Sequence, residues 1–119
     1  METRLEHRGS VTVAVPVGRI DFTTNTAFER ALAEALDAGA RRLVVDFGSV
    51  EFISSAGIRT LITVSRRLSA NQGTLALCGL TEPVRQVLDI SGLLPMFTTV
   101  PSIEEAVARL ASPDEATPL

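Results

Sequence analysis

The sequence has little of the chemistry on which catalytic and metal sites usually depend. Among 119 residues it contains one cysteine, Cys78, and one histidine, His7. A single cysteine excludes a disulfide bond within the chain, and no residues cluster with the spacing of metal ligands. No serine or cysteine is spaced from His7 as in a known nucleophile motif, so we do not expect a catalytic base there. The phosphate-binding loop Gly-x-x-x-x-Gly-Lys is absent as well.

Long apolar runs and excess positive charge are also missing. No stretch approaches the roughly 18 consecutive apolar residues that span a membrane. Residues 2–8 alternate charged side chains with others and do not form the apolar core of a signal peptide. A net charge of −3 argues against a general surface for nucleic acid or acidic membranes. We therefore expect a cytoplasmic protein that binds neither nucleic acid nor membrane.

The size and composition are those of a small globular domain. Hydrophobic residues make up 45% of the chain and charged residues 21%, which is ordinary usage. A chain of 119 residues can bury a sizeable core. Residues 112–119 include two prolines and show no hydrophobic periodicity. We expect one domain over residues 1–111 and a flexible C-terminal tail over residues 112–119.

Strand-like and helix-like patterns alternate along the chain, because short apolar runs alternate with segments whose apolar residues recur every three or four positions. We predict strands at residues 2–8, 11–15, 43–47, 74–78 and 96–100, and helices with N-caps at Thr23–Asn25, Ser54–Ser55, Thr81 and Ser102. The order indicates an α/β fold: a mainly parallel sheet of about five strands, with an N-terminal hairpin and four helices. Pro16 lacks a backbone N–H, so the second strand should end there or lie at an edge, with Gly18–Asp21 as a connection.

Two adjacent serines stand where the central strand region gives way to the second helix. Backbone N–H groups at a helix start are unpaired and carry the positive end of the helix dipole, so an added phosphate is favourable there. Ser54 and Ser55 are equally suited to a plain capping role, and the two roles are compatible. Because functional groups of parallel sheets gather at the carboxyl ends of the strands, we expect one shared face. Its members are Asp21, Asp46, Ser49, Ser54 and Ser55.

Four segments, in order and spacing, resemble the STAS domain, the family of bacterial anti-sigma factor antagonists. They are Gly18-Arg19-Ile20-Asp21, Val44-Val45-Asp46-Phe47-Gly48-Ser49-Val50, Ile53-Ser54-Ser55-Ala56-Gly57-Ile58, and Pro83-Val84-Arg85-Gln86-Val87-Leu88 followed by Ser91-Gly92-Leu93. The resemblance extends over roughly residues 5–111. It implies a regulatory binding protein, with no enzymatic activity, no cofactor and no metal.

The resemblance also implies partners and a switch. Family members bind an anti-sigma factor that is an ATP-dependent serine kinase, and this capture releases the sigma factor. Phosphorylation of a serine on the antagonist breaks the complex, and a serine phosphatase reverses the modification. The phosphoacceptor maps to Ser55, with Ser54 as the second choice. The expected partner-binding residues are Asp21, Asp46, Ser49, Ser54, Ser55, Ala56, Gly57 and Arg59.

One departure from the family pattern leaves alternatives open. The family usually has aspartate immediately before the phosphoacceptor, where this chain has Ser54. Ser54 could be a second acceptor, or the chain could bind its partner without being phosphorylated. A different class of function is a STAS subunit that binds the ATPase of an ABC-type transporter, also without phosphorylation. A small hydrolase that uses Ser55 is disfavoured because no catalytic base accompanies it.

Overall fold

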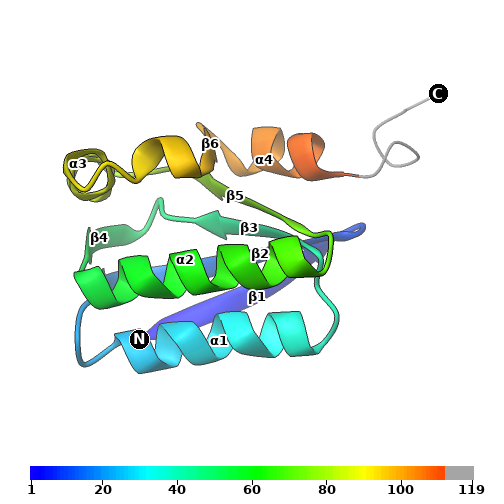
Figure 1. Cartoon of the computed structure of the whole chain (residues 1–119), viewed down its shortest axis with the longest axis horizontal. Coiled ribbons are helices and arrows are strands. Elements are labelled where there is room, and N and C mark those ends of the chain that lie inside the picture. Colours follow the sequence, from blue (N-terminus) through cyan, green and yellow to red (C-terminus); the bar gives the residue numbers. More distant parts are fainter. Residues whose placement is uncertain (112–119) are drawn as a thin grey trace.

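A six-stranded, mostly parallel sheet organises the chain in the computed structural model, which describes residues 1–111 (Figure 1). The elements in order are β1 (Glu2–Arg8), β2 (Val11–Ile20), α1 (Asn25–Asp37), β3 (Arg42–Asp46), β4 (Val50–Ile53), α2 (Ser55–Ala70), β5 (Thr74–Cys78), α3 (Glu82–Ile90), the short 3-10 helix η1 (Leu94–Met96), β6 (Thr98–Val100) and α4 (Ile103–Leu110). The sheet order is β1-β2-β3-β5-β6, and β4 pairs with β2. Within residues 1–111, β1 and β2 form the only antiparallel pair.

This architecture confirms the predicted α/β fold class, the N-terminal hairpin and the central position of β3. The prediction of about five strands omitted β4, a four-residue strand that follows β3 after a short turn. The predicted strand at residues 96–100 is shorter, because residues 94–96 form η1 and β6 contains only three residues. The predicted tail at residues 112–119 lies outside the described residues.

The expectation for Pro16 was wrong. Strand β2 neither ends at Pro16 nor lies at an edge, and Gly18 to Ile20 belong to the strand instead of a connection. The ladder to β3 ends at Ala14 and the ladder to β4 begins at Gly18. Residues 15–17 therefore have a ladder partner only in β1. A residue without a backbone N–H is tolerated where β2 changes partners, because no ladder bond is required on that side.

The two faces of the sheet are covered unequally. On one face α1, α2 and α3 bury a large core that includes Phe28, Leu61 and Leu88, each at 0% exposure. On the other face α4 covers a smaller apolar cluster through Ala106 and Leu110. Right-handed crossovers between successive parallel strands place the first three helices on the same side of the sheet. The parallel strands all run in the same direction, and β2 and β4 end together at the edge of the molecule where α1 and α2 begin.

Of two predicted N-cap residues, Ser102 and Thr81, the first makes the capping hydrogen bond and the second does not. Ser102 caps α4 as predicted, because its hydroxyl oxygen accepts a hydrogen bond from the Glu105 N–H at 3.2 Å. Thr81 occupies the N-cap position of α3, but its hydroxyl instead donates to the Val50 carbonyl at 2.7 Å and joins α3 to β4. Among the described helices, none is long and apolar enough to cross a membrane.

Candidate functional site

Ser54 is a buried structural residue at the junction of β4 and α2. It has extended backbone angles, and its hydroxyl oxygen accepts a hydrogen bond from the Gly57 N–H at 3.4 Å, so it serves as the N-cap of α2. Its own N–H donates to the Ile20 carbonyl at 2.7 Å, which continues the pairing of β4 with β2. Only 8% of Ser54 is exposed to solvent. A partner enzyme therefore has little access to this hydroxyl.

Ser55 has the opposite environment. It is the first residue of α2 and is exposed. The first turn of α2 contains no acidic residue that would neutralise the positive end of the helix dipole. Within residues 1–111, the Ser55 hydroxyl makes no hydrogen bond, so it is available to an approaching group. An exposed hydroxyl beside unpaired backbone N–H groups can accept a phosphoryl group and hold the resulting anion.

Gly57 brings α2 directly against the sheet. A Cβ at this position would lie 2.7 Å from Ile20 Cγ2 and 2.7 Å from Ile53 Cγ1. Gly57 is buried, so it does not form the outer surface beside Ser55. Ala56, which is half-buried, lies nearer the surface. The absence of a side chain at position 57 thus allows the N-terminus of α2 to contact the sheet, and it does not clear space for a partner.

Asp21 organises the connection between β2 and α1. Its Oδ1 accepts hydrogen bonds from the Thr23 N–H at 2.9 Å, the Thr23 hydroxyl at 2.7 Å and the Thr24 N–H at 3.1 Å. These bonds, the one from the Thr23 hydroxyl most strongly, lower the pKa of Asp21 below its ordinary value. The carboxylate is therefore ionised at neutral pH and holds the loop in one conformation.

The Asp21 loop and the start of α2 lie at the same edge of the molecule, at the left in Figure 1. The pairing of Ile20 with Ile53 places the two chain segments next to each other. A hydrogen bond of 3.1 Å from the Thr60 hydroxyl to Asn25 Oδ1 joins α2 to the start of α1. The structure therefore brings Asp21 and Ser55 to one edge, as expected from the strand ends.

Phe22 is a surface feature that sequence reasoning missed. It follows Asp21 in the β2–α1 loop and is 80% exposed. A phenylalanine inside a turn, between an aspartate and two threonines, is the available signal in the sequence. Aromatic residues, phenylalanine among them, are enriched in protein interfaces relative to the rest of the surface.

Asp46 and Ser49 lie apart from the Ser55 edge. In the β2 register, Val45 is opposite Ala14 and Ile53 is opposite Ile20. Six residues of β2 separate these two levels, which is roughly 20 Å of strand. Asp46 Oδ1 accepts a hydrogen bond from the Gly48 N–H at 2.9 Å and shapes the turn between β3 and β4 that contains Ser49. The expected single face therefore divides into two regions.

Asp46 also lies beside the thiol of Cys78. The pairing of β3 with β5 places these two residues opposite each other. Burial, and to a smaller extent the negative charge of Asp46, raises the pKa of Cys78 to about 12. Cys78 is fully buried, so its thiol is a packing group of the smaller core. Cys78 is the last residue of the strand that the sequence predicts at residues 74–78.

Arg59 lies one helical turn after Ser55 and is exposed. Side chains four residues apart on a helix are neighbours on its surface, with Cβ atoms about 5–6 Å apart. Arg59 makes no ion pair within residues 1–111. Arg59 thus presents a positive charge on the surface one helical turn from Ser55.

The fold and this edge define a small α/β domain that presents an exposed serine at a helix N-terminus. A sequence profile described as the STAS domain matches residues 2–106. The chain belongs to the STAS domain family.

Several relatives and solved structures that are similar to this chain are named as anti-sigma factor antagonists. "Putative anti-sigma factor antagonist BtrV" of Bordetella bronchiseptica is 36% identical over 91% of this chain and 93% of its own length. An anti-sigma factor antagonist from Mycobacterium paratuberculosis has a similar structure, with a TM-score of 0.85, 25% identity, and coverage of 93% of this chain and 94% of that one. The anti-sigma factor antagonist SpoIIAA, solved in its unphosphorylated form, has a TM-score of 0.78, 25% identity, and coverage of 91% and 95%.

Proposed function

We propose that this protein is an anti-sigma factor antagonist that captures an anti-sigma factor kinase and is released by phosphorylation at Ser55. The names of its relatives support the first part of the proposal. The observation that supports the second is the contrast between the two serines, since Ser55 is exposed at the start of α2 and Ser54 is buried beneath it. Both partner and antagonist would act in the cytoplasm, where sigma factors work.

The protein acts as a substrate and a binding partner, and not as an enzyme. The Ser55 oxygen would attack the γ-phosphorus of ATP held by the kinase, and ADP would leave. A base on the kinase would accept the hydroxyl proton. A serine phosphatase would hydrolyse the phosphoester with water, which restores the hydroxyl. These steps require from this chain only an accessible oxygen in a favourable electrostatic position.

Phosphorylation should leave the antagonist folded. A phosphoserine carries about −1.5 to −2 charges at neutral pH. At the N-terminus of α2 that charge is stabilised by about 0.3–1 kcal/mol, and Arg59 lies one turn away. Because Ser55 is exposed, its phosphate would lie on the surface and would not enter the core or the Asp21 loop. No part of the fold therefore needs to rearrange.

Phosphorylation should weaken the complex with the partner more than it affects the stability of the antagonist's own fold. A partner packed on this edge would cover Ser55 and the exposed ring of Phe22 together. A bulky dianion there would need solvation and would repel acidic groups, including the ionised Asp21 nearby. A loss of about 3 kcal/mol of binding free energy weakens affinity more than a hundredfold. The switch therefore acts at the interface.

Kinase assays with single serine variants test the assignment. The protein, Ser55→Ala and Ser54→Ala are each incubated with the anti-sigma factor kinase of the same organism and ATP, and phosphate is located by mass spectrometry. We expect phosphate on Ser55 in the unsubstituted protein and in Ser54→Ala, and none in Ser55→Ala. Phosphate on Ser54, or stable binding to a transporter ATPase without any phosphate, would contradict the proposal.

A further inference from the structure

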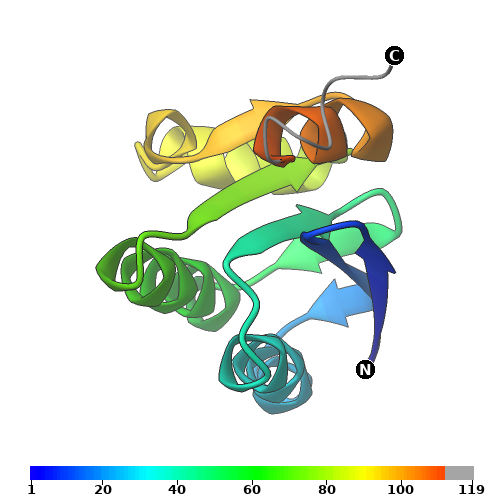
Figure 2. The same ribbon diagram turned by 90° about the vertical axis from the view of Figure 1, so that its right-hand side faces the viewer.

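Strand β1 is a free lateral edge of the sheet. Within residues 1–111 it pairs only with β2, and Figure 2 shows its outer side, at the right, without a neighbouring strand. Alternate residues of this seven-residue strand therefore point unpaired N–H and C=O groups outward. The opposite edge, β6, is only three residues long. Long exposed edges of this kind pair with other strands unless their side chains prevent it.

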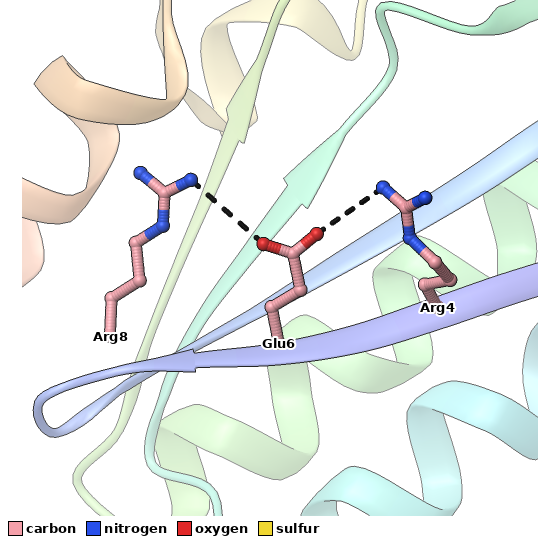
Figure 3. Close-up of polar contacts among 3 residues, drawn as sticks. All are labelled: Arg4, Glu6 and Arg8. Carbon is pink, nitrogen blue, oxygen red and sulfur yellow. Dashed lines mark hydrogen bonds and ion pairs between the residues drawn. The ribbon is translucent and has the colours of Figure 1, made fainter.

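The outer strand has four charged side chains on one face. Glu2, Arg4, Glu6 and Arg8 are opposite valines of β2 and lie on the same face as α4. In the single chain the Glu6 carboxylate forms ion pairs with both arginines (Figure 3). Arg4 Nη2 lies 3.3 Å from Glu6 Oε2, and Arg8 Nη2 lies 3.9 Å from Glu6 Oε1. These side chains are 37–63% exposed. Exposed ion pairs of this type contribute little to stability, so they can be exchanged for others.

The order of these charges is complementary to itself. If two copies of β1 pair antiparallel around a two-fold axis at Leu5, Glu2 faces Arg8 of the second copy and Arg4 faces its Glu6. Every charged side chain of the strand then faces one of opposite sign. Leu5, which is 36% exposed in the single chain, faces its own copy on the axis and becomes covered. Facing pairs of opposite charge stabilise antiparallel strands.

Neighbouring registers are disfavoured by the same charges. A two-fold axis at Glu6 makes that residue face itself and Arg4 face Arg8, and an axis at Arg4 makes Arg4 face itself and Glu2 face Glu6. Like charges directly opposite each other are destabilising. The charges that protect this edge in most arrangements therefore select one arrangement, in which all seven residues pair.

We propose that the protein forms a homodimer through β1, paired antiparallel around Leu5, so that one sheet continues through both copies. The inference is independent of the proposed function, because β1 lies on a lateral edge and Ser55 lies at the carboxyl ends of the strands. A single pair of strands is a small interface, so the dimer forms reversibly and depends on concentration.

Charge reversal in trans tests the interface. Sedimentation velocity from about 10 µM to about 1 mM should show a growing dimer fraction for the unsubstituted protein. Arg4→Glu and Glu6→Arg should each weaken the dimer about tenfold or more, because each makes like charges face each other twice. Mixing the two variants should restore a dimer. In the mixed dimer the new carboxylate faces the new guanidinium, and native Glu6 of one chain faces native Arg4 of the other.

The mixture also controls for damage to the fold. Each variant carries the same substitution alone and in the mixture, so mixing could not restore a dimer if the substitution had damaged the fold. A monomer at all concentrations, or single variants that associate as strongly as the unsubstituted protein, would overturn the proposal. So would a mixture that stays monomeric while each variant shows native thermal unfolding.

A cysteine at the axis reports the register. Mild oxidation of Leu5→Cys should give a disulfide-linked dimer, because facing residues of antiparallel strands have Cα atoms about 4.5–5.5 Å apart. His7→Cys is the matched control, because residue 7 faces Thr3 of the second copy and not itself. The native Cys78 is fully buried and does not compete. Equal crosslinking of both variants would contradict this register.

Discussion

Replacing Gly57 by alanine should destabilise the protein, because α2 contacts the sheet at this residue. The added Cβ would lie 2.7 Å from atoms of both Ile20 and Ile53, and real Cβ atoms do not approach other atoms so closely. The two contacted atoms, Cγ2 and Cγ1, are bonded directly to Cβ of their residues, and the isoleucines are 0% and 1% exposed. Neither side chain can withdraw without a shift of β2, β4 or α2.

Two opposing contributions determine how far Gly57→Ala lowers the free energy of unfolding. Overpacking a core costs about 1–3 kcal/mol. Alanine is favoured over glycine inside a helix by about 1 kcal/mol. The free energy of unfolding should therefore fall by about 1 kcal/mol, up to about 2 kcal/mol if the core cannot relax. For a chain of this size the midpoint of thermal unfolding should drop by roughly 3–6 °C.

Thermal and urea unfolding followed by circular dichroism measure the effect. The control is Ser69→Ala on the same helix, where the side chain is exposed and the change should stay within about 0.5 kcal/mol. If Gly57→Ala is as stable as the unsubstituted protein, or more stable, the close approach of α2 to the sheet is refuted.

Three further predictions concern the two serines, Asp21 and Cys78. Ser54→Ala should lower the free energy of unfolding by about 1 kcal/mol through loss of the cap, whereas Ser55→Ala should change urea unfolding little. Asp21→Asn should destabilise the protein at neutral pH. Because the pKa of Asp21 is lower in the folded state, this stabilisation is present above the ordinary pKa of 3.8 and is lost as the pH falls through the folded value. The two proteins should therefore converge in thermal midpoint below about pH 4, and a constant difference would contradict the hydrogen bonds to Thr23 and Thr24. Cys78 should resist a thiol reagent in the folded protein and react after unfolding in urea, because it is buried with a pKa of about 12. Rapid labelling of the folded state would show that β5 opens.

Hydrophobic periodicity was sufficient to predict most of the fold. The apolar positions of α1 and α2 face the core as predicted, and the strand at residues 74–78 has the predicted limits. The sequence does not separate β4 from β3, because a four-residue strand after Gly48 and Ser49 continues the same apolar segment. The error at Pro16 has a different cause. The proline rule assumes one partner along each side of a strand, and a change of partner within β2 depends on contacts between distant segments.

The site was predicted in outline only. Strand ends correctly indicated that Asp21 and the serines share an edge. The sequence could not say which serine is the cap, because adjacent hydroxyls at a helix start have the same local pattern. It also placed Asp46 on this edge, since the register that separates Asp46 from Ser54 along β2 depends on the unpredicted strand β4. Exposure of Phe22 follows from the loop geometry and is not visible in composition.

The most direct test of the switch is the affinity of the antagonist for its anti-sigma factor kinase before and after phosphorylation. Isothermal titration should show tight binding by the unmodified protein and by Ser55→Ala. Protein phosphorylated on Ser55, and Ser55→Asp, should bind more weakly, the phosphorylated form by more than about a hundredfold. Equal affinity of the phosphorylated and unmodified forms would contradict the account.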